Sequence, residues 1–140
     1  MIHQIGKKLT RLNQWFVLTL AATTSLNARA VSLGHITLES SLNQPLRASI
    51  LLGNVQRLTP QDVRVGLAPR TAFQAMGVDW SSNLSDLDFR AVSSESGLRI
   101  ELSTEASIVE PYLNFVLELV WPNGRLVREY TVLLDPPVLM

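Results

Sequence analysis

The chain has 140 residues, of which 46% are hydrophobic, and its formal net charge is zero. This length suits one domain, and the hydrophobic content supports a packed core, which excludes global disorder. Four of the 12 basic residues and none of the 12 acidic ones lie in residues 1–30, so the remaining 110 residues carry a net charge of −4. An acidic body argues against nucleic-acid binding, and the absence of cysteine excludes disulfides and Cys-based metal sites.

The first thirty residues predict a secretory signal peptide. Three basic residues precede the short apolar run Trp15–Ala22, and Ala28–Ala30 form a small-x-small cleavage site. We therefore expect residues 1–30 to be removed and the mature chain to begin at Val31. The alternative is an uncleaved membrane anchor, although the apolar run is about half of the ~20 residues that a spanning helix needs.

Beyond Val31, apolar and polar residues alternate with the period of two that predicts strands. The first strands are expected at His35–Ser40, Pro45–Leu52 and Val63–Leu67. Leu58–Asp62 separates the last two and resembles a single helical turn, since a threonine can cap it and a proline suits its first position.

One short helix is predicted, at Ala68–Gly77. Ala72, Phe73 and Met76 share one of its faces, and Gly77 can adopt the left-handed conformation that ends a helix. At about two turns, such a helix needs to dock on something to be stable.

The second half of the chain predicts further strands at Leu87–Ala91 and Leu98–Leu102, which should pair through a Ser-rich turn. Asp79–Asp86 is expected to be a loop, and Ser103–Pro111 a connection.

The last third reads as a hairpin whose turn is Asn123-Gly124, a strong signal for a type I′ turn with positive φ at both residues. A two-residue loop there would place Trp121 opposite Leu126 and Glu118 opposite Glu129. The double proline at 136–137 ends the last strand, because neither residue can donate to a ladder.

About seven strands and one short helix predict an all-β fold, an antiparallel, immunoglobulin-like β-sandwich preceded by a signal peptide. The expected division is a signal peptide at 1–30, the sandwich at 31–137 and a tail at 138–140.

Glu118 and Glu129 are the candidates for catalysis, because two facing carboxylates could act as acid and base in an envelope hydrolase. The alternative is a pair of solvated surface acids, which the outward face of a sheet favours. His35 has no nearby acids at a ligand spacing, so no metal site is expected. Neither a nucleotide-binding glycine motif nor a nucleophile elbow is present, and no cofactor or small-molecule substrate is expected.

Three other side chains invite attention. Arg128 should project to the apolar face, either as a side chain that reaches the rim of the sheet or as one half of a buried ion pair with Asp86 or Asp88. Trp80 and Trp121 could belong to an interface or a glycan platform, although partly buried core edges are the alternative.

The stretches "SLNQPLRASI", "LTPQDVRVGLA" and "EPYLNFVLELVWPNGRLVREYTVLLDPP" resemble the N-terminal periplasmic domain of the FimV family, also called HubP or TspA. The resemblance covers about Leu33 to Pro137. It implies a role in type IV pilus assembly, twitching motility and organisation of the cell pole of Gram-negative bacteria. It carries no catalytic residues, so we expect a non-catalytic interaction or scaffolding domain in the periplasm, whose partners are other envelope or pilus-assembly proteins.

Family members usually continue into a peptidoglycan-binding LysM module, an acidic region, a membrane span and a cytoplasmic repeat domain. This sequence ends three residues after Pro137. The resemblance therefore suggests a truncated or free-standing member, with peptidoglycan as a ligand only if a LysM module is supplied elsewhere.

Overall fold

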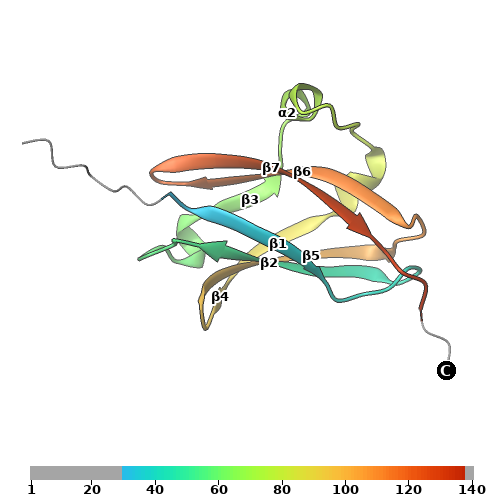
Figure 1. The fold of residues 1–140 in the computed structure, drawn as a ribbon, viewed down its shortest axis with the longest axis horizontal. Helices are drawn as coiled ribbons and strands as arrows, with labels where there is room; N and C mark the ends of the chain where they lie inside the picture. Colours follow the sequence, from blue (N-terminus) through green and yellow to red (C-terminus); the bar gives the residue numbers. More distant parts are fainter. Residues whose placement is uncertain (1–29, 138–140) are drawn as a thin grey trace, which may run out of the picture.

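Two antiparallel sheets lie face to face in the computed structural model, which describes residues 30–137 (Figure 1). Sheet A has the strand order β1-β2-β5-β4, and sheet B has the order β3-β6-β7. The strands are Ser32–Leu38 (β1), Pro45–Gly53 (β2), Arg64–Leu67 (β3), Asp88–Ser94 (β4), Gly97–Ser107 (β5), Tyr112–Trp121 (β6) and Gly124–Leu133 (β7). The predicted antiparallel sandwich is confirmed. The expected signal peptide and tail fall outside the described residues, apart from Ala30.

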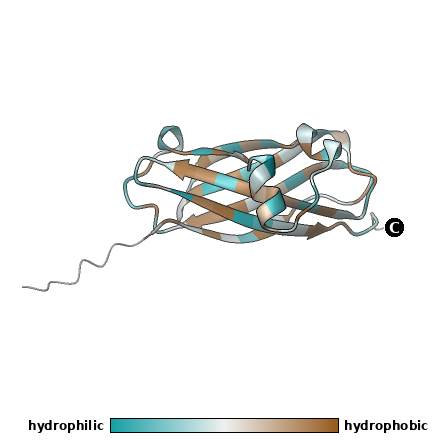
Figure 2. Ribbon diagram, turned by 90° about the horizontal axis from the view of Figure 1, so that it is seen from above, coloured by the Kyte–Doolittle hydropathy of each residue, from teal (hydrophilic) through white to brown (hydrophobic). Residues whose placement is uncertain are grey.

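The hydrophobic core lies between the two sheets, as the period-two alternation predicts. Figure 2 shows hydrophobic residues interspersed with hydrophilic ones along the strands. The inward side chains of β2 and β5 are buried together with those of β6: Leu46, Ala48, Ile50, Leu52, Leu98, Ile100, Leu102, Leu113, Phe115, Leu117 and Leu119. Aromatic rings link the layers. Phe115 stacks on Tyr130 of β7 at 5.9 Å between ring centroids, and Phe89 of β4 meets it edge-on at 6.1 Å.

The helix α2 (Arg70–Ala75) forms within the predicted segment and covers part of the outer face of sheet B (Figure 1). Just before it, the Ala68 N–H donates to the carbonyl of Val116 on β6 at 2.9 Å. Phe73 of the helix and Val116 are almost fully buried, although Val116 points away from the core between the sheets. Docking on the sheet therefore stabilises this short helix.

The end of α2 follows the expected glycine cap. Gly77 has a φ of +70°, its N–H donates to the Gln74 carbonyl, and the next N–H, of Val78, donates to the Phe73 carbonyl at 2.9 Å. Met76 was expected to share the buried face with Phe73, and this was wrong: it is 41% exposed. The helix ends at Ala75, so Met76 is already its cap and turns away from the sheet.

The β6–β7 hairpin differs from the prediction in its register. Trp121 pairs with Gly124, and Pro122 and Asn123 are the two central residues of the turn. Neither Asn123 nor Gly124 has positive φ, so the type I′ turn was wrong. Proline suits the first central position, because its ring fixes φ near −65°. The register moves by two residues relative to the prediction, which leaves every side chain on the predicted face.

Several element bounds also differ. β1 begins at Ser32 rather than His35, with an irregularity between Leu33 and Ile36. A 3-10 helix, η2 (Ser82–Asp86), occupies much of the expected loop. The predicted helical turn near residue 60 is present as the 3-10 helix η1 (Pro60–Asp62).

The strand β5 extends to Ser107, where a connection was expected. A buried threonine explains the extension. The Thr104 hydroxyl accepts a hydrogen bond from the Leu46 N–H and donates one to the Ala106 carbonyl, each at 2.8 Å. A side chain thus satisfies the backbone where β2 and β5 lose their regular register, between Pro45 and Arg47.

Candidate functional site

Glu118 and Glu129 do not lie directly opposite each other, contrary to the predicted register. Glu118 lies opposite Val127, and Glu129 lies opposite Val116. The Arg125 Nε also donates to a Glu118 carboxylate oxygen at 2.6 Å, which leaves Glu118 in an ion pair near the surface. The shift in hairpin register places the two glutamates diagonally instead of directly opposite each other, and the ion pair with Arg125 engages the carboxylate of Glu118.

Arg128 does not form an ion pair with Asp86 or Asp88, and its guanidinium does not simply extend to solvent at the rim of the sheet. Its guanidinium donates to the backbone carbonyls of Leu33 and Gly34, the latter at 3.1 Å, and lies over the Tyr130 ring at 4.9 Å from the centroid. The Tyr130 hydroxyl donates to the same Gly34 carbonyl at 2.8 Å. Two side chains of β7 therefore hold the β1 backbone where the two sheets meet, a structural role.

Burial raises the pKa of the Tyr130 hydroxyl, and the neighbouring Arg128 charge opposes that effect. The hydroxyl stays protonated at neutral pH and can keep its hydrogen bond to Gly34.

Trp80 and Trp121, the candidate interface residues, are both partly buried and pack against the core. The Arg70 guanidinium covers the Trp80 ring at 4.1 Å. Trp121 lies so close to Gly124 that a Cβ there would be 2.7 Å from its Cζ2 atom. Trp80 lies in the α2–η2 segment beside the start of β6, whereas Trp121 is the last residue of β6, so the two are not brought together into one platform.

His35 is exposed, and residues 30–137 contain no group of three or more His, Cys, Asp or Glu placed to hold a metal ion. Over the same residues, no helix is long and apolar enough to cross a membrane.

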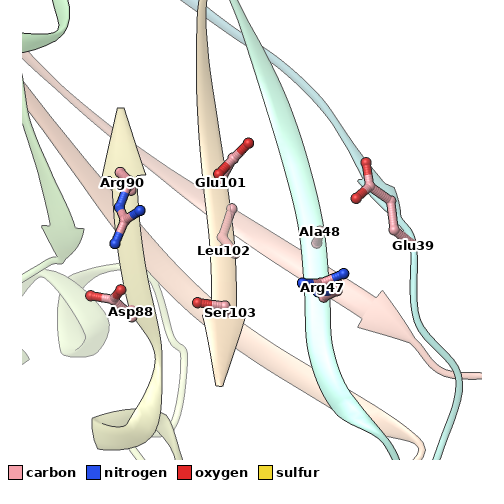
Figure 3. A pocket seen from close by; sticks show the side chains of 8 residues that line it. All are labelled: Glu39, Arg47, Ala48, Asp88, Arg90, Glu101, Leu102 and Ser103. Carbon is pink, nitrogen blue, oxygen red and sulfur yellow. The ribbon is translucent and has the colours of Figure 1, made fainter. Parts of the chain in front are cut away.

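The outer face of sheet A carries a charged site. An open hollow of about 370 Å³ crosses its strands, and five charged side chains line it: Glu39, Arg47, Asp88, Arg90 and Glu101 (Figure 3). The strand register brings them together from distant parts of the sequence. Arg47 and Asp88 both lie opposite Ser103, and Arg90 lies opposite Glu101.

The two arginines of this charged hollow are available to a partner. Glu101 already pairs with Arg99 at 2.8 Å, and Glu39 accepts a hydrogen bond from Ser49. Among the described residues, neither Arg47 nor Arg90 forms an ion pair. Exposed guanidinium groups of this kind bind carboxylates of another protein in a planar, two-point geometry.

Sequence reasoning missed this hollow, because its residues lie on four separate segments and each looks like an ordinary polar strand position. The available signal was the alternation itself, which places Arg47, Asp88 and Arg90 on the outward side of their strands.

The topology defines the class of protein. Strands β1, β2, β5 and β4 correspond to A, B, E and D of the seven-stranded constant-type immunoglobulin fold, and β3, β6 and β7 correspond to C, F and G. Within that class, the chain belongs to the FimV N-terminal domain family. The model of this family, described as the FimV N-terminal domain, an Ig-like domain, matches residues 31–137.

Two curated relatives are each named Motility hub protein FimV, one from Pseudomonas aeruginosa strain PAO1 and one from strain UCBPP-PA14. The chain is 47% identical to each over 116 residues, which cover 82% of this chain and 13% of the relative. The chain thus spans about an eighth of the length of these relatives. No solved structure matches the chain.

Proposed function

We propose that this chain is a non-catalytic interaction domain of the bacterial envelope, which contributes to pilus-based motility and the organisation of the cell pole. Membership of the FimV N-terminal family and the motility hub name of its relatives support this role. The observation that carries the proposal is the charged hollow on sheet A, where Arg47 and Arg90 stand exposed without an ion pair among the described residues.

The chemistry of the hollow favours a protein partner over a substrate. The hollow is open and holds charges of both signs, whereas small-molecule sites are mostly enclosed and apolar. Charges of both signs on an open surface give specificity and orientation to a protein interface. The partner in this proposal is another envelope or pilus-assembly protein.

The compartment is part of the same proposal. We infer export through the residue 1–30 segment, followed by cleavage before Val31, because a basic start, an apolar run and a small-x-small site occur in that order. Mass spectrometry of the protein recovered from the periplasm of a Gram-negative host tests both export and cleavage, because a cleaved chain has the mass of a protein that begins at Val31. A chain that begins at Met1 and remains with the membrane would contradict the inference.

A domain exchange tests the proposed role. Residues 31–137 would replace the matching segment of the Pseudomonas aeruginosa motility hub protein, and twitching zones would be compared with those of the natural protein and of a variant that lacks the segment. We expect the exchange to restore twitching that the deletion abolishes. Equal twitching with and without the segment would overturn the proposal, provided that the three proteins accumulate to equal levels.

A further inference from the structure

A second surface, at one end of the sandwich, combines exposed apolar side chains with carboxylates. Val109, Tyr112 and Leu133 are 71%, 52% and 69% exposed. Tyr112 and Leu133 lie directly opposite each other, where β6 begins and β7 ends, and Val109 precedes them in the β5–β6 connection. Large apolar side chains gathered at an open surface mark interaction sites more often than scattered ones do.

Two adjoining hollows extend this surface into a groove. One, of about 250 Å³, lies between η2 and the β5–β6 connection, and the other, of about 340 Å³, lies between the α2–η2 segment and β6. Both are bordered by Asn83, Glu110 and the buried Leu113. The Asn83 side-chain amide donates to a Glu110 carboxylate oxygen at 3.3 Å where the hollows meet. We call the two hollows, with the three exposed apolar side chains, the end groove.

The charge of the end groove has one sign. Asp79, Asp86 and Glu110 line it, and no lysine or arginine is among its described lining residues. Arg70, on the neighbouring helix, is stacked on Trp80 and does not line either hollow. A groove that combines apolar side chains with carboxylates and has no basic lining residue raises the local concentration of cationic partners.

We propose that the end groove docks a cationic amphipathic segment of a partner protein, whose apolar side chains pack on Val109, Tyr112 and Leu133 while its lysines or arginines meet Asp79, Asp86 and Glu110. The proposal rests on the role of the domain as an interaction module, and it adds a second docking surface, whose lining residues differ from those of the charged hollow on sheet A. Charge complementarity selects this partner, because the acidic rim repels an acidic segment and leaves a neutral one without ion pairs.

Binding would be measured by nuclear magnetic resonance on the full chain recovered from the envelope fraction. The probe is a synthetic amphipathic peptide of leucine and lysine, and the matched control peptide has glutamate in place of each lysine. We expect saturable shifts of amides in residues 79–86, 107–114 and 131–134, with no such response to the glutamate peptide. Raising the salt concentration to about 0.5 M should weaken binding about tenfold, because the attraction is screened.

Matched variants locate the site. The triple change Asp79→Asn, Asp86→Asn and Glu110→Gln keeps the hydrogen-bond acceptors, and should weaken peptide binding about tenfold. The pair Val109→Ser and Leu133→Ser should weaken it about as much. Glu129→Gln and Leu51→Ser are the controls, an exposed acid and an exposed leucine outside the groove, and should leave binding unchanged.

Equal binding of both peptides, shifts confined to sheet A, or unaltered affinity in both groove variants would overturn the proposal. None of these results depends on twitching. The peptide-binding test can therefore contradict the end-groove proposal while the domain exchange supports the proposed function, and the opposite outcome is equally possible.

Discussion

Arg128 shows how a single residue closes this sandwich. Its guanidinium reaches two carbonyls of β1, so a charged side chain on the inward side of β7 satisfies backbone groups of the other sheet. β1 and β7 are edge strands of different sheets. Side-chain hydrogen bonds therefore take the place of a backbone ladder between them.

Replacing Arg128 by alanine should destabilise the domain by about 2 kcal/mol, since hydrogen bonds to a charged donor are lost and partly buried carbonyls are left without it. Urea unfolding measures the change. Arg125→Ala is the matched control, because it breaks a surface ion pair on the same strand and should cost less than about 1 kcal/mol. Equal effects of the two substitutions would contradict the role given to Arg128.

Tyr130 makes the stability of the domain sensitive to alkaline pH. Its folded pKa is raised above the ordinary value of 10.0, so the protonated form is favoured by folding. That contribution is fully present below about pH 10 and is lost as the pH rises through the folded pKa. The free energy of unfolding should therefore fall as the pH rises from the ordinary tyrosine pKa of about 10 through the higher folded pKa of Tyr130.

Tyr130→Phe should flatten this decline, because it removes the titrating hydroxyl. Few other side chains of residues 31–137 titrate at alkaline pH. This segment contains no lysine or cysteine and only one other tyrosine, the exposed Tyr112. A decline of the same size in Tyr130→Phe would show that another group is responsible.

At the scale of elements, the β6–β7 hairpin depends on a side-chain contact at Gly124 as well as on the conformation of its turn. Gly124 has no positive φ, but a Cβ at this position would lie 2.7 Å from the Cζ2 atom of Trp121, too close unless the ring shifts. Glycine is therefore required by the indole, and Pro122 provides the conformation of the turn.

Gly124→Ala should destabilise the domain by about 1–3 kcal/mol, because the added methyl group displaces the Trp121 ring. The same substitution in a Trp121→Ala background should be nearly neutral, and thermal unfolding of the four proteins measures the coupling. A cost that persists without the tryptophan would indicate backbone strain at position 124 instead.

The alternation of residues located the strands and the core, because a period of two decides which side chains are buried. It could not decide the hairpin register. Turns centred on Pro122-Asn123 and on Asn123-Gly124 place the same residues on the same faces, so burial alone does not distinguish them. The hydrogen-bond partners of Arg128 could not be predicted either, because they are the backbone carbonyls of Leu33 and Gly34, and the pattern of side chains does not indicate which backbone groups accept a hydrogen bond.

At the scale of the whole molecule, the core is enclosed and the functional features lie outside it. The charged hollow on sheet A assembles only when β1, β2, β5 and β4 are in register, and the end groove assembles only when η2 meets the β5–β6 connection. The residues of both surfaces are visible in the sequence, but the sequence alone does not show that folding brings them together. The alternation of residues predicted the fold, the family resemblance supplied the expected role, and the strand register of the structure revealed the surfaces.

The most direct measurement is twitching by the exchanged hub protein in which Arg47→Gln and Arg90→Gln remove both free guanidinium groups of the charged hollow. Arg57→Gln, at an exposed arginine outside the hollow, is the control. We predict that the double variant accumulates and folds normally but loses twitching, whereas the control retains it. Full twitching by the double variant, at an unchanged protein level, would contradict the claim that this face of the domain is where the partner docks.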